Sequence, residues 1–316
     1  MSFLSHLDTI IPAKLARKPT ISLTREVWST PDNDRIAVDH SSTQLSGKRL
    51  VLFHGLEGGS SSHYAKYIVA KLQQVGWAVT LPHFRTCGEL ANLQPRAYHA
   101  GDYEEIGWII QQVANQFRPT ELYVAGVSLG GNALLHWLGK APHLAHQLVK
   151  GAAAISAPMN LLKAGNALNI GWNKKLYGNY FLYSLKPKAL AIIRQHPALS
   201  SQLNVGKIEN ATTIGEFDEY FTAPLHGFKS VDDYWEKASS LPLLKQISVP
   251  TLLLNALNDP FIPADSLPSS NDVSSLVTRQ FPARGGHVGF QKGCFLAKQN
   301  NALPDIVLNY FHSLPN

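Results

Sequence analysis

Short apolar segments recur along the whole chain at the spacing expected of buried strands. Several are continuous apolar runs rather than alternating ones, which is typical of strands covered on both faces of a sheet. We expect eight strands, at residues 21–28, 35–39, 49–53, 77–81, 121–127, 149–155, 251–256 and 276–281. From the third strand onward, helical patterns separate most of them, at residues 63–75, 102–117, 131–139 and 302–314.

This alternation predicts an α/β fold with a mostly parallel eight-stranded sheet flanked by helices, entered through two antiparallel strands. The alternation stops between residues 158 and 241, where irregular helical stretches rich in aromatic residues are broken by Gly or Pro at 171, 178, 187, 197 and 224. A structureless loop of that length is rare inside a compact domain. We therefore expect one domain over residues 1–316, with a helical cap inserted at about 158–241 above the carboxyl ends of the strands. The alternative is an ordinary extra helical layer.

Composition narrows the class of protein. With 45% hydrophobic and 16% charged residues among 316, the chain has the composition of a globular protein. It contains no uninterrupted apolar run of the length that a membrane span needs, and its first 18 residues lack the pattern of a secretory signal. The two cysteines, Cys87 and Cys294, form no metal-binding or redox motif, which suits a reducing compartment. We expect a cytoplasmic protein.

The net charge of +6 is concentrated in one region. Residues 122–208 contain no Asp or Glu but nine Lys and Arg. Because these basic residues are interleaved with apolar ones and form no compact run, the pattern argues against nucleic-acid binding. It suggests peripheral contact with an anionic lipid or membrane surface, with ordinary solvated helix faces as the alternative.

The strongest chemical signal is a G-x-S-x-G pattern formed by Gly126, Ser128 and Gly130. A predicted strand precedes it and a predicted helix follows it, which is the context of a nucleophilic serine on a sharp turn. The two glycines give the turn room. The helix that follows would direct free backbone N–H groups and the positive end of its dipole toward an oxyanion.

A serine nucleophile needs a base, and the base needs an orienting group. His287 is our candidate base, because it lies in a Gly-rich loop directly after the last predicted strand. Asp259, at the end of the strand before it, is our candidate carboxylate, and the chain order Ser, Asp, His fits an α/β-hydrolase. Asp265 and Asp272 are the runners-up.

The second donor of an oxyanion hole should come from the Gly-rich turn after the third strand. We expect the backbone N–H groups of Leu56 and Leu129 to form the hole. His54 we interpret as a structural residue that orients this turn together with Gly55. Glu57 is either a supporting partner or a solvated residue.

These segments resemble the YheT-like α/β-hydrolases, a group related to lung-type α/β-hydrolase phospholipases and to yeast medium-chain ethyl ester synthases. The resemblance covers nearly the whole chain, and its marks are residues 54–59 (HGLEGG), 62–64, 83–85, 87–89, 98–102, 126–132 (GVSLGGN) and 285–290 (GGHVGF). It implies a triad at Ser128, Asp259 and His287, carboxylesterase or lipase-like activity, and neither a metal nor an organic cofactor.

The sequence therefore predicts a serine hydrolase that cleaves an apolar acyl ester or lipid through an acyl-enzyme. Acyl transfer to an alcohol is an alternative, since it uses the same intermediate. A ligand-binding homologue without activity is a second alternative. Peptidases and thioesterases stay open because the same triad serves them, whereas a dehalogenase would need a carboxylate at position 128. The sequence leaves the oligomeric state open.

Overall fold

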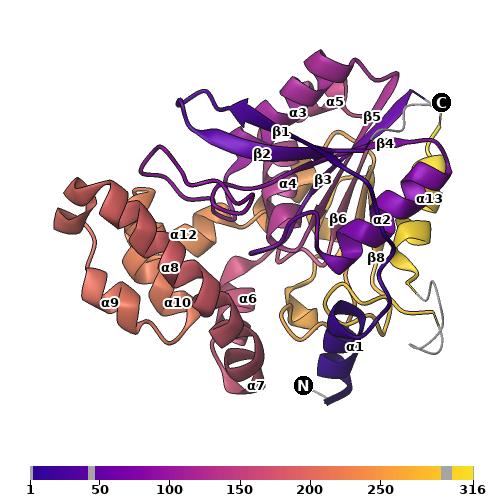
Figure 1. Ribbon diagram of the computed structural model, residues 1–316. Helices are drawn as coiled ribbons and strands as arrows, with labels where there is room; N and C mark the ends of the chain where they lie inside the picture. The colour runs from indigo at the N-terminus through magenta and orange to yellow at the C-terminus, as the bar shows by residue number, and fades with distance from the viewer. Residues whose placement is uncertain (1–2, 42–46, 293–300, 316) are drawn as a thin grey trace.

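A single eight-stranded sheet runs through the protein in the computed structural model, which describes residues 3–41, 47–292 and 301–315 (Figure 1). Cys294 lies outside these residues. The sheet has the order β1-β2-β4-β3-β5-β6-β7-β8. Its strands are β1 (Thr24–Ser29), β2 (Arg35–His40), β3 (Lys48–Phe53), β4 (Ala78–Pro82), β5 (Glu121–Val127), β6 (Gly151–Ile155), β7 (Thr251–Leu254) and β8 (Val277–Gln280).

The direction of the strands agrees with the sequence-based expectation. Strand β1 pairs with β2 in antiparallel register, β2 pairs with β4 in the same way, and every pair from β4 to β8 is parallel. Alternate side chains of the central strands enter different cores: Val51 and Phe53 pack in one apolar cluster, and Leu50 and Leu52 pack in another. The predicted mostly parallel sheet with an antiparallel entry is confirmed.

Helices cover both faces of the sheet. One apolar core contains buried residues of α3 and α4, and the other contains buried residues of α2 and α13. The flanking helices are α2 (His63–Gln74), α3 (Tyr103–Phe117), α4 (Leu129–Lys140), α5 (Pro142–Leu148) and α13 (Leu303–His312). Two helices were not expected from the sequence, the short α5 and the N-terminal α1 (Phe3–Lys14). Helix α1 contains a proline at position 12, which weakened its helical signal.

A group of helices lies between β6 and β7 and projects to one side of the sheet (Figure 1). We call residues 161–246 the cap. It consists of α6 (Leu161–Leu168), α7 (Gly171–Asn173), η1 (Lys174–Gly178), α8 (Asn179–Gln195), η2 (Pro197–Ser201), α9 (Val205–Asn210), α10 (Ile214–Phe217), η3 (Asp218–Thr222), α11 (Ala223–Leu225), α12 (Val231–Ala238) and η4 (Leu241–Gln246), where η marks π- or 3₁₀-helical turns. The remaining short turns are η5 (Ala264–Ser266) and η6 (Ser270–Asp272).

Two expected breaks in the cap are wrong. Gly178 has helical backbone angles and lies inside the continuous run of α7, η1 and α8, and Pro187 lies inside α8 and does not end it. The ring of Pro187 removes the hydrogen bond to the carbonyl of Tyr183, but Tyr183 is highly exposed, so this part of the helix can be hydrated instead. Within the described residues, no helix combines the length and the apolar character that crossing a bilayer requires.

Candidate active site

Ser128 occupies the sharp turn between β5 and α4. Its backbone has φ 53° and ψ −121°, a combination that non-glycine residues rarely adopt. The turn is held by a hydrogen bond of 2.8 Å from the Ser128 N–H to the Ile155 carbonyl and by one of 3.0 Å from Asn132 to the Ser128 carbonyl. A strained residue that its surroundings hold in place is a mark of a functional position.

The glycines of the motif are required by close packing. A Cβ on Gly126 would overlap the carbonyl of Gly130, and a Cβ on Gly130 would overlap the carbonyl of His54. The first contact lies within the serine turn, and the second joins that turn to the loop after β3. The two glycines therefore allow the serine turn and the β3 loop to approach each other.

His287 and Asp259 form a hydrogen-bonded pair. The Nδ1 of His287 lies 2.8 Å from Oδ2 of Asp259, whose side chain is fully buried. The other carboxylate oxygen, Oδ1, accepts the backbone N–H of Phe261 at 2.8 Å. An ionised carboxylate can only accept, so Nδ1 of His287 carries the proton and Nε2 is left available as a base. The ring of Phe261 lies against the imidazole, with 4.2 Å between the ring centroids.

The N-terminal helix α1 supports the histidine loop, a role that the sequence did not indicate. The hydroxyl of Thr9 accepts the backbone N–H of His287 at 2.9 Å. Asn258 accepts the N–H groups of Gly285 and Gly286 through Oδ1 and donates through Nδ2 to Asp8. The position of Asn258, directly before the candidate carboxylate, was the only sequence signal that could have pointed to this support.

Hydrogen bonds hold His54 inside the loop after β3. Its Nε2 accepts the N–H of Phe84 at 3.0 Å, so Nδ1 carries the proton and donates to the Gly55 carbonyl at 2.7 Å. Burial lowers the pKa of His54 to about 3, and the ring is therefore neutral. These contacts fix the path of the loop toward Ser128: a Cβ on Gly55 would stand only 3.1 Å from that of the serine.

The same loop leaves one backbone donor free. The N–H of Gly55 is bonded to the Tyr64 hydroxyl, and those of residues 57, 58 and 59 are bonded to Tyr98, Gly55 and Ser62. Within the described ranges, the N–H of Leu56 makes no hydrogen bond, and neither does that of Leu129 in the first turn of α4. Both residues line the same hollow as Ser128.

Glu57 connects the loop to the cap. Its carboxylate is almost completely buried and accepts from the Tyr98 hydroxyl at 2.8 Å, from the Lys188 ammonium at 2.7 Å and from the Ser184 hydroxyl. Lys188 and Ser184 both belong to α8 of the cap. Glu57 is therefore a supporting partner rather than a solvated residue, and it directly follows Leu56.

Two hollows meet at Ser128. The first has a volume of about 1060 Å³, part of it open to solvent, and lies between the cap and the sheet. Most of its lining is apolar, including Leu161, Leu185, Ile192 and Phe221. The second, of about 1360 Å³ with its open part, lies between α1 and the start of α8. Ser128, His287, Leu56, Phe181 and Phe261 line both.

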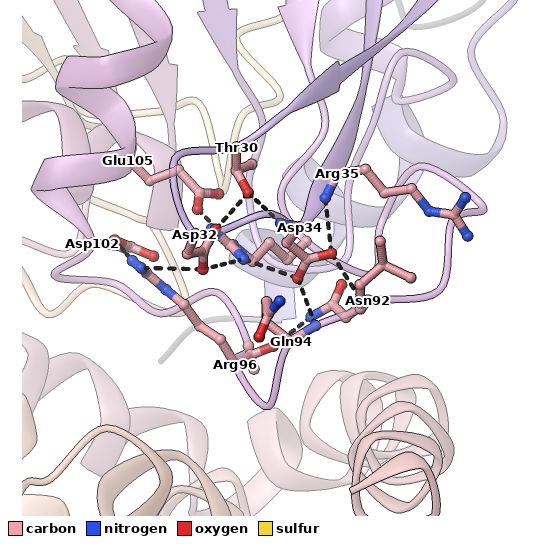
Figure 2. Close-up of polar contacts among 12 residues, drawn as sticks. Thr30, Asp32, Asp34, Arg35, Asn92, Gln94, Arg96, Asp102 and Glu105 are labelled. Carbon is pink, nitrogen blue, oxygen red and sulfur yellow. Dashed lines mark hydrogen bonds and ion pairs between the residues drawn. The ribbon is translucent and has the colours of Figure 1, made fainter.

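A buried ionic network fixes the loop between β4 and α3, residues 83–102 (Figure 2). Residues of this loop form one wall of the first hollow. Arg85 bonds to Glu105 at 2.6 Å and to Asp34 at 2.9 Å, and it also contacts Asp32. Asp34 in turn accepts the backbone N–H groups of residues 93 and 94. At the far end of the loop, the Asn132 amide of α4 donates to the carbonyls of Ala100 and Ala238, which joins the loop to the cap.

The structure separates the candidate aspartates. Asp259 bonds to His287, whereas Asp265 pairs with Lys163 at the surface and Asp272 caps a short turn through Ser269. Neither Asp265 nor Asp272 lines the two hollows that meet at Ser128. Among residues 3–41, 47–292 and 301–315, no group of His, Cys, Asp or Glu side chains is arranged to hold a metal ion.

The fold and the site define a class of protein. An eight-stranded, mostly parallel sheet with a strained serine after β5 and an Asp–His pair after β7 and β8 is the arrangement of an α/β-hydrolase. Residues 48–293 match the family model described as the alpha/beta hydrolase fold. The chain belongs to this family.

Individual relatives agree with the family. The chain is 31% identical over 314 residues to "Putative esterase YheT" of Escherichia coli (strain K12), an alignment covering 98% of this chain and 91% of that protein. It is 27% identical to phospholipase ABHD3 of Bos taurus, over 92% of this chain and 71% of that one. Among solved structures, the Pyrococcus furiosus esterase Pf2001 shares the fold, with a TM-score of 0.61 at 15% identity over 94% of this chain and 92% of that one. The resemblance predicted from the sequence is confirmed.

Proposed function

We propose that the protein is a serine carboxylester hydrolase that works through an acyl-enzyme. Ser128 attacks the ester carbonyl while Nε2 of His287 takes the hydroxyl proton, and Asp259 stabilises the imidazolium. The proton then passes to the leaving alcohol, and a water molecule activated by the same imidazole releases the acid. The observation that carries this proposal is the hydrogen bond of 2.8 Å between His287 and Asp259, together with the strained backbone of Ser128. Ser128 and His287 line the same hollow.

The oxyanion of the tetrahedral intermediate would lie between the N–H groups of Leu56 and Leu129. Support comes from the lack of any other partner for these two groups within the described residues. The N-terminal end of α4 adds its dipole at the same point. Loss of one such donor typically costs about 3 kcal/mol of transition-state stabilisation.

The first hollow favours an apolar acyl chain. Its aliphatic and aromatic lining would replace water around the chain of a medium-chain ester or a lipid. One buried carboxyl interrupts this lining: Asp218, which accepts a hydrogen bond of 2.9 Å from Nε1 of Trp235. Burial raises the pKa of Asp218 to about 6, so it is largely neutral in mildly acidic solution. Relatives named as an esterase and a phospholipase also support an ester substrate.

The experiment is replacement of the nucleophile, Ser128→Ala, with Ser248→Ala as the matched control. The Ser248 hydroxyl donates to the Pro142 carbonyl, away from the site. We expect hydrolysis of short p-nitrophenyl esters to fall by about 10⁴-fold or more in S128A, together with loss of labelling by a fluorophosphonate probe. The control should keep both. Wild-type activity in folded S128A would contradict the proposal.

The same assays separate the alternative functions. Adding a primary alcohol to the wild-type reaction would yield a new ester if the acyl-enzyme is resolved by acyl transfer. A folded wild-type protein that neither labels nor hydrolyses would favour a ligand-binding homologue without activity. Amide and thioester substrates test the peptidase and thioesterase alternatives, which share the triad.

A further inference from the structure

The cap carries a row of exposed apolar side chains. Trp172, Leu176, Tyr180 and Tyr183 follow one another at spacings of three or four residues along the continuous helical run of α7, η1 and α8, so they share one side of it. Trp172 is 67% exposed, Tyr180 59% and Tyr183 86%. Scattered exposed apolar residues are ordinary, but four on one side of one helical run form a patch that needs a partner.

Basic side chains are interleaved with this row. The Lys175 ammonium lies 5.6 Å from the ring centroid of Trp172, and that of Lys14 from α1 lies 5.0 Å from the ring of Tyr180. Arg17 and Lys18, just beyond α1, are also exposed. We call this surface, formed by Trp172, Leu176, Tyr180 and Tyr183 with Lys14, Arg17, Lys18 and Lys175, the docking face.

Acidic groups that could neutralise the docking face are scarce. Residues 122–208 contain no Asp or Glu, so α6, α7 and α8 contribute none. In α1 the acidic residue is Asp8, which is paired with Arg284 at 2.8 Å. The face therefore combines aromatic rings with uncompensated positive charge, the composition found where proteins lie on anionic membrane surfaces.

Four of the eight residues of the docking face line a hollow that reaches the candidate catalytic residues. Leu176, Tyr180, Lys14 and Lys18 line the second hollow, whose inner wall includes Ser128. In Figure 1, α1 and α7 both lie at the lower edge of the molecule. The hollow itself is lined by residues of α1 and of the start of α8. A partner bound to this face would therefore lie against the hollow that reaches Ser128.

We propose that the docking face binds the surface of an anionic lipid bilayer, from which an ester enters the second hollow and reaches Ser128. This inference rests on the proposed function. A second copy of the chain is a poor occupant, because two such faces carry the same charge and would repel each other. A small soluble anion would leave the exposed aromatic rings without a partner, whereas tyrosine and tryptophan rings are well suited to the boundary between headgroups and acyl chains.

The test uses the S128A protein, which cannot consume the lipid, and co-sedimentation with vesicles of phosphatidylcholine alone or with 30% phosphatidylglycerol. We expect binding to the anionic vesicles that weakens at 0.5 M salt and little binding to the neutral ones. Replacing Lys175 and Arg17 with Gln should weaken anionic binding roughly tenfold or more. The matched control replaces Lys140 and Lys245, two exposed lysines outside the face, with Gln.

A second pair of variants tests the aromatic row. Trp172→Ser with Tyr183→Ser should weaken binding by a similar factor. Val27→Ser with Leu276→Ser, which removes two apolar side chains that are 55% and 43% exposed outside the face, should not. In the wild-type background all four variants should hydrolyse a soluble p-nitrophenyl ester at the parental rate. The inference would be overturned if vesicle binding did not depend on lipid charge and salt, or if the face variants and the control variants lost binding equally. Self-association of the protein through this face would also overturn it. The assay with a soluble ester measures catalysis without membrane binding, so failure of this inference can be distinguished from failure of the proposed function.

Discussion

At the scale of single residues, the site depends on Ser128 being held in an unfavourable backbone conformation. A non-glycine residue at positive φ costs about 1–3 kcal/mol, which neighbouring contacts must offset. The hydrogen bond to Ile155 and the close fit of Gly126 against Gly130 supply those contacts. The serine hydroxyl can then project from the turn while the backbone stays tied to β6.

Asp259→Asn tests the orienting role of the carboxylate. The amide oxygen can still accept the N–H of Phe261, but the amide NH₂ would face Nδ1 of His287 and favour the tautomer whose proton is on Nε2. A histidine in that tautomer cannot take the serine proton. We expect kcat to fall by about 10⁴-fold with little change in KM, measured on a short p-nitrophenyl ester. The control is Asp265→Asn, because Asp265 pairs with Lys163 at the surface. Equal effects of the two substitutions would contradict the proposed role of Asp259.

Ser128, His287 and Asp259 could be proposed from the sequence because each lies directly after a predicted strand. Parallel strands bring such positions to one edge of the sheet. Thr9, which also supports the histidine loop, could not be proposed in this way. Its role depends on α1 packing against a loop almost 280 residues away in sequence, and no local pattern encodes that contact.

At the scale of secondary-structure elements, the link between the β3 loop and α8 joins the cap to Leu56, the proposed oxyanion donor. The carboxylate of Glu57 is buried with Tyr98, Ser184 and Lys188, and its own backbone follows that of Leu56. A shift of α8 would therefore move the backbone at Leu56. The sequence predicted the helical character of the cap at about 158–241, but not the π-helical turns η1 and η3. It also did not predict the Glu57–Lys188 ion pair, because its partners lie 131 residues apart in the sequence.

Lys188→Met should weaken this link. The variant keeps the aliphatic stem but leaves the buried carboxylate of Glu57 without its cation, which we expect to cost about 1–3 kcal/mol of stability because Lys188 is itself partly exposed. Since the loop that carries Leu56 is loosened, kcat should fall more than KM rises. Lys186→Met is the matched control: this lysine, two residues earlier on α8, donates to the carbonyl of Glu209 at the surface. If thermal unfolding and steady-state kinetics gave the same results for the two variants, the proposed link between α8 and the β3 loop would be refuted.

At the scale of the whole molecule, the buried network of Figure 2 ties the sheet, the loop of residues 83–102 and α3 into one unit. The eight strands and their directions could be predicted because apolar runs and helical periodicity are local signals. The network could not, since Arg85 finds its partners Asp34 and Glu105 at separations of 51 and 20 residues. A single sequence does not reveal which of many charged residues will meet.

This network has more carboxyl groups than cations. Asp32, Asp34, Asp102 and Glu105 share the guanidinium groups of Arg85 and Arg96. Burial, together with the nearby Asp102, raises the pKa of Glu105 to about 7, so in the folded protein its protonated form is favoured below that pH. Its contribution to stability is complete below the pKa of the unfolded chain, near 4.5, and is lost as the pH rises through about 7.

Glu105→Gln tests this dependence on pH. The free energy of unfolding of the wild type, measured with urea between pH 5 and 8, should contain a component from Glu105 that falls by roughly 2–3 kcal/mol over this range. Glutamine stays neutral at every pH, so the free energy of unfolding of the variant should lack this pH-dependent component. Near pH 8 the variant should therefore gain stability relative to the wild type. Glu104→Gln, at the exposed neighbouring position of α3, should keep the wild-type slope. If E105Q and the wild type lose stability in parallel with increasing pH, the proton that the network releases belongs to another group, and Glu105 is ionised throughout.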